Sequence, residues 1–264
     1  MKSIELFLLM ATLSMAGMIL YDRVMLLLKR PPGLLFNAAL VALLVGAVFS
    51  HALILRGVVW SLLFFAITTV VPYLVEAIGV RTGIPFGHYR YTKLMEPFGP
   101  FGVPVAVAGI WPVVLYFSVV DAEVLFTYFD WTMSLSRLLP TAAVIAMAAD
   151  FLIEPTLVTK GYWIWDRERS SRIRWRTIPW TNFVGWFGTA LFTLILAFAA
   201  NGFLLPHQPN FTGDWLFPAP LLWAGLGVLN LVFAALHDRI PEVVIGGIVV
   251  CLCAFWLFYQ MAFV

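Results

Sequence analysis

The chain has few charged residues and few cysteines. Only 11% of its 264 residues are Asp, Glu, Lys or Arg, whereas soluble domains carry about 25%. Hydrophobic residues make up 62% of the sequence, so the composition excludes an ordinary soluble domain and indicates an integral membrane protein. The two cysteines, Cys251 and Cys253, would point to opposite sides of a helix, and we interpret both as packing residues.

Several common chemistries lack the residues that they need. The GxSxG elbow of hydrolases and the phosphate-binding P-loop are both absent. The four histidines are scattered without the paired spacing of a metal site, so we expect no metal. No lysine lies within a predicted membrane span, which excludes a retinal Schiff base, and no basic run suggests nucleic acid.

The sequence does contain long apolar runs. About 20 apolar residues cross a bilayer as a helix. Eight runs of this kind cover roughly residues 4–22, 33–54, 58–79, 102–120, 138–158, 181–204, 217–236 and 241–262. We therefore predict one all-α domain over residues 1–264, a polytopic transmembrane bundle of about eight helices surrounded by membrane lipids. The first run lacks a small-residue cleavage signature after it, so we expect a retained helix rather than a cleaved signal peptide.

Basic residues predict the orientation of this bundle. With eight helices, thirteen Lys and Arg residues fall on one side of the membrane and three on the other, namely Lys2, Arg56 and Arg137. The positive-inside rule places the basic side in the cytoplasm and both termini outside. We expect a multi-pass protein of the cytoplasmic (inner) membrane.

Two acids lie inside the apolar run 138–158. Asp150 and Glu154 are four residues apart, so they share one face of a helix. A charge in hydrocarbon costs several kcal/mol, and such residues mark functional sites unless they make structural hydrogen bonds across the bundle. Pro155 removes an intrahelical hydrogen bond, so we expect a kink or break at Glu154. Four other acids are expected in solvated loops on the far side: Asp121, Glu123, Asp130 and Asp214.

Two long loops on the basic side, 80–101 and 159–180, connect the helices that carry the polar residues. Glu76 lies about one turn before the first loop, and Asn182 follows the second. Glu76 either belongs to a site with the acid pair or forms an ion pair with Arg81 at the interface. Trp163 and Trp165 alternate, which suits an extended segment with both indoles on one side, either as interfacial anchors or as an aromatic wall for a flat or cationic ligand.

These blocks together resemble the carotenoid biosynthesis membrane family that includes the CruF-type carotenoid hydratases. The resemblance covers roughly residues 70–190. It rests on Glu76, Gly79, Thr82-Gly83, Phe86-Gly87, Tyr89 and Tyr91, then Asp150 and Glu154-Pro155, then Gly161-x-Trp163-x-Trp165, then Pro179-x-x-Asn182-Phe183-x-Gly185-Trp186. One departure is Thr177, where family members tend to have glycine, which affects the expected shape of the second loop.

The resemblance implies a hydro-lyase reaction. Water adds across the terminal 1,2 double bond of an acyclic (ψ) carotenoid end group and gives a tertiary alcohol, without a redox cofactor or a metal. The implied substrates are lycopene, γ-carotene or a bacterioruberin precursor, and other carotenoid enzymes are candidate partners. The polyene reaches the site from the bilayer, and the site is expected near the cytoplasmic face, where water can enter.

This chemistry suits the polar residues. A carboxylic acid in a low dielectric can stay protonated near neutral pH, so it can protonate an alkene, and a second carboxylate can take a proton from water. We assign Asp150 as proton donor and Glu154 as the base that orients water, with Glu76 competing for either role. The other expected site residues position water or line the end-group pocket: Tyr89, Tyr91, Trp163, Trp165, Asn182 and Trp186.

Two other functions stay open from the sequence. A carotenoid cyclase shares the first protonation step, but it lets the cation close on its own chain and needs water excluded. A transporter or a carotenoid-binding protein without catalytic activity is the alternative from another class. A transporter is expected to show repeats or broken helices near the midplane, whereas here the polar groups lie toward one face.

Overall fold

The computed structural model describes residues 34–204, which form a helical bundle with two short sheets at one end. Within this range the α-helices are α2 (Leu34–Arg56), α3 (Val58–Thr82), α4 (Val105–Tyr128), α5 (Leu135–Lys160) and α6 (Trp180–Leu204). They correspond to the second to sixth predicted spans, and Gly57 alone separates α2 from α3. The first, seventh and eighth predicted spans, with Cys251 and Cys253, lie outside the described residues.

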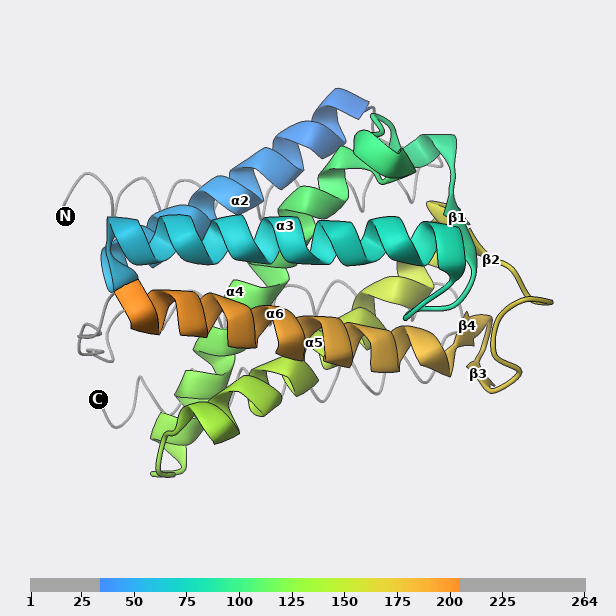
Figure 1. Ribbon diagram of the computed structural model, residues 1–264. Coiled ribbons are helices and arrows are strands. Elements are labelled where there is room, and N and C mark those ends of the chain that lie inside the picture. Colours follow the sequence, from blue (N-terminus) through green and yellow to red (C-terminus); the bar gives the residue numbers. More distant parts are fainter. Residues whose placement is uncertain (1–33, 205–264) are drawn as a thin grey trace, which may run out of the picture.

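Helices α3 and α6 run side by side in opposite directions, and α4 and α5 pack across them (Figure 1). Helix α2 packs mainly on α4. Large aromatic side chains fill the interior between α3, α4 and α6. The rings of Trp60 and Phe64 stack with their centroids 4.6 Å apart, and the Phe198 ring makes edge contacts with both. Buried aromatic rings contribute strongly to helix packing because each buries a large apolar area.

Three of these helices are long and apolar enough to cross a membrane: α3, α4 and α6. Helix α2 has a shorter apolar stretch, Val41–Arg56. Helix α5 has 26 residues, but it carries Arg137, Asp150 and Glu154. The length and composition of α3, α4 and α6 agree with the predicted membrane character.

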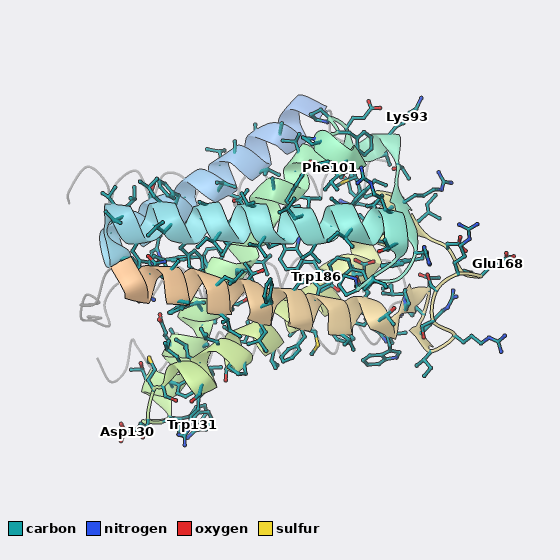
Figure 2. The ribbon with its side chains drawn as sticks, in the orientation of Figure 1. Lys93, Phe101, Asp130, Trp131, Glu168 and Trp186 are labelled. Carbon is teal, nitrogen blue, oxygen red and sulfur yellow. The ribbon has the colours of Figure 1, made fainter. Side chains whose placement is uncertain are left out.

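The two long loops meet at one end of the bundle. Strand β1 (Tyr89–Tyr91) pairs antiparallel with β2 (Trp163–Trp165), and β3 (Arg174–Trp175) pairs with β4 (Ile178–Pro179). Two short 3₁₀ helices, η1 (Lys93–Met95) and η2 (Pro100–Gly102), complete the first loop. Figure 2 shows Lys93 and Glu168 at this end and Asp130 and Trp131 at the opposite end.

Two expectations from the sequence are wrong. Helix α5 continues through Pro155 to Lys160, so the predicted break at Glu154 is wrong. Helix α4 continues to Tyr128, so Asp121 and Glu123 lie in a helix and not in a loop. Glu123 is buried and accepts a hydrogen bond of 2.6 Å from Arg56. This ion pair explains how a helix inside the bundle can contain a buried carboxylate. Asp130 is exposed after the end of α4, as expected, and Asp214 lies outside the described residues.

Candidate functional site

Three acids from two helices line one interior cavity. Glu76 comes from α3 and Asp150 and Glu154 from α5, and their exposed fractions are 6%, 1% and 3%. The cavity measures about 80 Å³. All nine side chains that the sequence singled out line it: Glu76, Tyr89, Tyr91, Asp150, Glu154, Trp163, Trp165, Asn182 and Trp186. Helical spacing alone brought Asp150 and Glu154 to one face, but only the tertiary fold adds Glu76.

Glu154 is held by two indole groups. Its Oε1 accepts a hydrogen bond of 2.7 Å from Trp163 Nε1 and one of 2.8 Å from Trp165 Nε1. Two donors on one oxygen stabilise the carboxylate form of the side chain. The tryptophans therefore contact an acid of the site, which goes beyond the role of interfacial anchors.

Glu76 is held by three aromatic donors. Its Oε2 accepts hydrogen bonds from the Tyr89 hydroxyl and, at 3.0 Å, from the Tyr91 hydroxyl. Trp111 Nε1 donates to Oε1 at 3.4 Å. The alternative ion pair with Arg81 is wrong, because the Arg81 guanidinium lies over the Phe101 ring, 5.1 Å from its centroid.

Asp150 has a different partner. Its Oδ2 accepts a hydrogen bond of 2.6 Å from the Asn182 side-chain amide, which comes from the first turn of α6. Asp150 and Glu154 thus each have a hydrogen-bond donor, and each lines the cavity. The functional role of the acid pair stays a prediction.

The β1–β2 sheet supplies four of the aromatic side chains. In an antiparallel pair, directly opposite residues point to the same face and successive residues alternate. Tyr89 pairs with Trp165 and Tyr91 with Trp163, and all four line the cavity. The intervening Arg90 and Ile164 are exposed. The extended segment with both indoles on one side is therefore confirmed.

The two tyrosine hydroxyls are buried against a carboxylate. Burial, and then the charge of Glu76, raise the pKa of Tyr89 and of Tyr91 well above the usual value for tyrosine. Both phenols therefore keep their protons across the physiological range and stay hydrogen-bond donors to Glu76.

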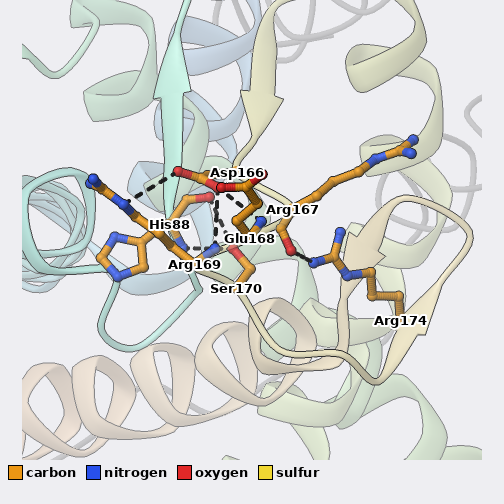
Figure 3. Close-up of polar contacts among 7 residues, drawn as sticks. All are labelled: His88, Asp166, Arg167, Glu168, Arg169, Ser170 and Arg174. Carbon is orange, nitrogen blue, oxygen red and sulfur yellow. Dashed lines mark hydrogen bonds and ion pairs between the residues drawn. The ribbon is translucent and has the colours of Figure 1, made fainter.

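A polar network ties the two loops together beyond the sheet (Figure 3). The His88 carbonyl accepts from the Asp166 backbone N–H at 2.8 Å, and Ser170 Oγ accepts from the His88 backbone N–H at 3.0 Å. The backbone N–H groups of Arg169 and Glu168 donate to Asp166 and lower the pKa of that carboxyl. This network fixes the outer end of the sheet and so helps to hold its aromatic face toward the acids.

Trp111 is a further residue of this cavity, and no motif in the sequence predicted it. This side chain is 1% exposed, donates to Glu76, and stacks on Trp186 with ring centroids 4.2 Å apart. Trp111 lies inside an apolar run without a polar neighbour, so no local motif marked it. Its position within a span, away from the interface where tryptophans gather, was the available signal.

The described residues hold no group of three His, Cys, Asp or Glu side chains arranged to bind a metal ion. The hydrogen-bond donors and aromatic faces around the three acids can position water and stabilise positive charge.

The chain resembles known carotenoid proteins in sequence. The chain is 30% identical over 171 residues to a bisanhydrobacterioruberin hydratase of Haloarcula japonica, an alignment that covers 61% of this chain and 54% of that protein. The aligned part thus spans about half the length of the curated relative. No solved structure matches the chain. The family model for carotenoid biosynthesis proteins matches residues 36–253, and the chain therefore belongs to the carotenoid biosynthesis protein family.

Proposed function

We propose that this protein is a carotenoid hydratase that adds water across the terminal 1,2 double bond of an acyclic carotenoid end group. The observation that carries the proposal is the cavity in which Glu76, Asp150 and Glu154 lie together among aromatic rings. The family and the hydratase of Haloarcula japonica support the same reaction class. The candidate substrates are lycopene, γ-carotene and bacterioruberin precursors such as bisanhydrobacterioruberin.

The hydrogen bonds favour Asp150 as the proton donor. Glu154 accepts from two indoles and Glu76 from two phenols and an indole, and these donors stabilise the ionised forms of both. Among the described residues, Asp150 accepts from a single side-chain donor, the amide of Asn182. Within residues 34–204 it has the fewest donors of the three acids to stabilise a carboxylate, so we assign it the proton.

The proposed reaction has two proton transfers. The carboxyl group of Asp150 protonates C2 of the end group, which leaves a tertiary cation at C1. Water attacks C1, and Glu154 accepts the proton that the water loses. Return of this proton from Glu154 to Asp150 restores the starting state, so the net change is the addition of one water.

Aromatic rings and polar groups complete the arrangement. The faces of Trp163, Trp165 and Trp186 surround the cavity and stabilise a developing cation. Asn182 and Tyr89 hold the water by hydrogen bonds. A cavity of about 80 Å³ has room for a few water molecules, so the end group enters only when lining side chains move.

The proposal places the protein in the cytoplasmic membrane with this site near the cytoplasmic face. The loops at the site end carry most of the basic residues of the described range, such as Arg90, Lys93, Arg167 and Arg172. Basic loops favour the cytoplasmic side. The substrate approaches from the bilayer and the water from the loop end.

Expression in bacteria that accumulate lycopene, and in bacteria that accumulate bisanhydrobacterioruberin, tests the reaction. We expect a pigment heavier by one water for each reacting end group, measured by chromatography and mass spectrometry. An isomer of unchanged mass would indicate a cyclase, and unaltered pigment in both strains would contradict the proposal.

The residue roles are tested by amide substitutions. Asp150→Asn and Glu76→Gln are each expected to abolish the hydrated pigment while the protein still inserts in the membrane. Asp130→Asn is the matched control, because Asp130 is exposed at the opposite end of the bundle (Figure 2). Normal turnover by both site variants would overturn the assignment.

A further inference from the structure

A second hollow lies next to the acid cavity, on the outer side of α3 and α6. This groove measures about 630 Å³. Its lining is mostly apolar and includes Val75 of α3 with Val184, Gly188 and Phe192 of α6. Val184 and Phe192 are 65% and 54% exposed, so this groove is open on the surface of the described helices, and in a bundle that spans a membrane we expect it to face lipid.

The groove and the acid cavity lie at the same level of the same two helices. On α3, Val75 lines the groove and the next residue, Glu76, lines the cavity. On α6, Gly185 lines the groove and the next residue, Trp186, lines the cavity. The α3–α6 pair is therefore the wall that separates a lipid-facing groove from the acids.

The Phe86 ring fills a notch in this wall. An added Cβ at Gly79 of α3 would lie 2.9 Å from the ring, and one at Gly185 of α6 would lie 2.8 Å from it. The ring thus sits between two glycines of neighbouring helices, is 1% exposed, and lines the cavity. The residue before it, Pro85, lines the groove. One side chain therefore stands between the two spaces.

We propose that the groove holds the conjugated chain of the carotenoid while its end group passes the Phe86 notch and enters the acid cavity. This inference rests on the proposed hydratase function. A conjugated polyene is a stiff apolar rod that cannot fold into a cavity of about 80 Å³, so most of it must lie outside. The groove offers an apolar surface directly beside the one notch that we identify between the described residues of α3 and α6.

Gly188 allows the groove to be filled without disturbing the wall. An added Cβ at Gly188 meets no atom within 4 Å, and the residue lines the groove. Gly202 also lies on α6, is exposed, and has the same open surroundings, but it does not line the groove. Gly188→Trp and Gly202→Trp therefore add the same side chain to the same helix inside and outside the groove.

The test measures pigment binding and conversion together. In an Asp150→Asn background, purified protein is titrated with lycopene and with bisanhydrobacterioruberin, and retained pigment is read by absorbance. We expect Gly188→Trp to weaken binding about tenfold or more and, with Asp150 intact, to lower conversion in cells, while Gly202→Trp does neither. Val184→Trp is a second groove variant if Gly188→Trp does not accumulate.

Two results would overturn the groove assignment. In the first, the groove variants bind and convert pigment as well as Gly202→Trp does. In the second, the groove variants lose a co-purified phospholipid while their pigment binding is unchanged, which would make the groove a lipid site. Failure of the proposed function can be told apart from failure of the groove assignment. If the proposed function is wrong, the unaltered protein forms no hydrated pigment, and the binding titration still tests the groove.

Discussion

At the scale of single residues, the site depends on how strongly each carboxyl group is hydrogen-bonded. Trp165 donates to Glu154 over 2.8 Å, whereas Trp111 donates to Glu76 over 3.4 Å, near the limit for a hydrogen bond. Both indoles are buried, with exposed fractions of 7% and 1%. The two tryptophans are therefore both buried donors to an acid, and the bond from Trp165 is the shorter.

We predict that Trp165→Phe lowers the turnover rate more than Trp111→Phe. A hydrogen bond to a charged group contributes about 1.5–3 kcal/mol, so losing the short one should cost roughly ten- to a hundredfold in rate. Trp111→Phe should cost less than about tenfold. Initial rates of hydration at saturating pigment measure both. Equal losses would mean that these rings act through packing alone.

The tyrosines of β1 predict an alkaline effect on stability. The pKa of Tyr91 is raised by burial and by Glu76, so above about pH 10 the unfolded chain loses a proton that the folded protein keeps. Stability is therefore fully present below about pH 10 and falls as the pH rises toward the folded pKa. Tyr91→Phe should show a shallower fall of the melting temperature between about pH 9 and pH 11. An unchanged slope would contradict this.

At the scale of elements, α6 combines a tightly packed glycine with an open one. An added Cβ at Gly185 would lie 2.8 Å from the Phe86 ring and 3.1 Å from the Pro85 backbone, and backbone cannot move cheaply. We predict that Gly185→Ala destabilises the protein by about 1–3 kcal/mol. Gly188→Ala should stabilise the helix by up to about 1 kcal/mol. Denaturation in detergent measures the free energy of unfolding of both variants, and equal changes would show that Phe86 does not pack tightly against Gly185.

The elements also show which features the sequence could predict. Hydrophobic runs located α2, α3, α5 and α6 to within a few residues, because membrane-length apolar stretches are a strong signal. Helical period placed Asp150 and Glu154 on one face. The pairing of β1 with β2 joins residues more than 70 positions apart, and no local pattern encodes such a contact. The predicted end of α4 was wrong because Glu123 forms an ion pair with Arg56 of α2, a residue far away in the sequence.

At the scale of the whole molecule, the described bundle is asymmetric. The three acids, the aromatic sheet and the tied loops gather at one end, and the buried Arg56–Glu123 pair lies toward the other. The proposed reaction between a membrane-soluble polyene and water would benefit from this arrangement, because each reactant would reach the acids from its own phase. In the proposed function, the groove beside α3 and α6 faces lipid and the β1–β2 sheet lies at the end that faces water.

The orientation of this asymmetric bundle in the membrane is a prediction that labelling can test. Asp130 and Glu168 are both exposed and lie at opposite ends (Figure 2). In a background with Cys251→Ser and Cys253→Ser, a membrane-impermeant maleimide added to intact cells should label Asp130→Cys and spare Glu168→Cys. Permeabilised cells, in which both positions react, provide the control. The positive-inside rule requires this outcome because basic residues surround Glu168. Labelling of Glu168→Cys alone would place the acids near the outer face, and water would then reach them from outside the cell.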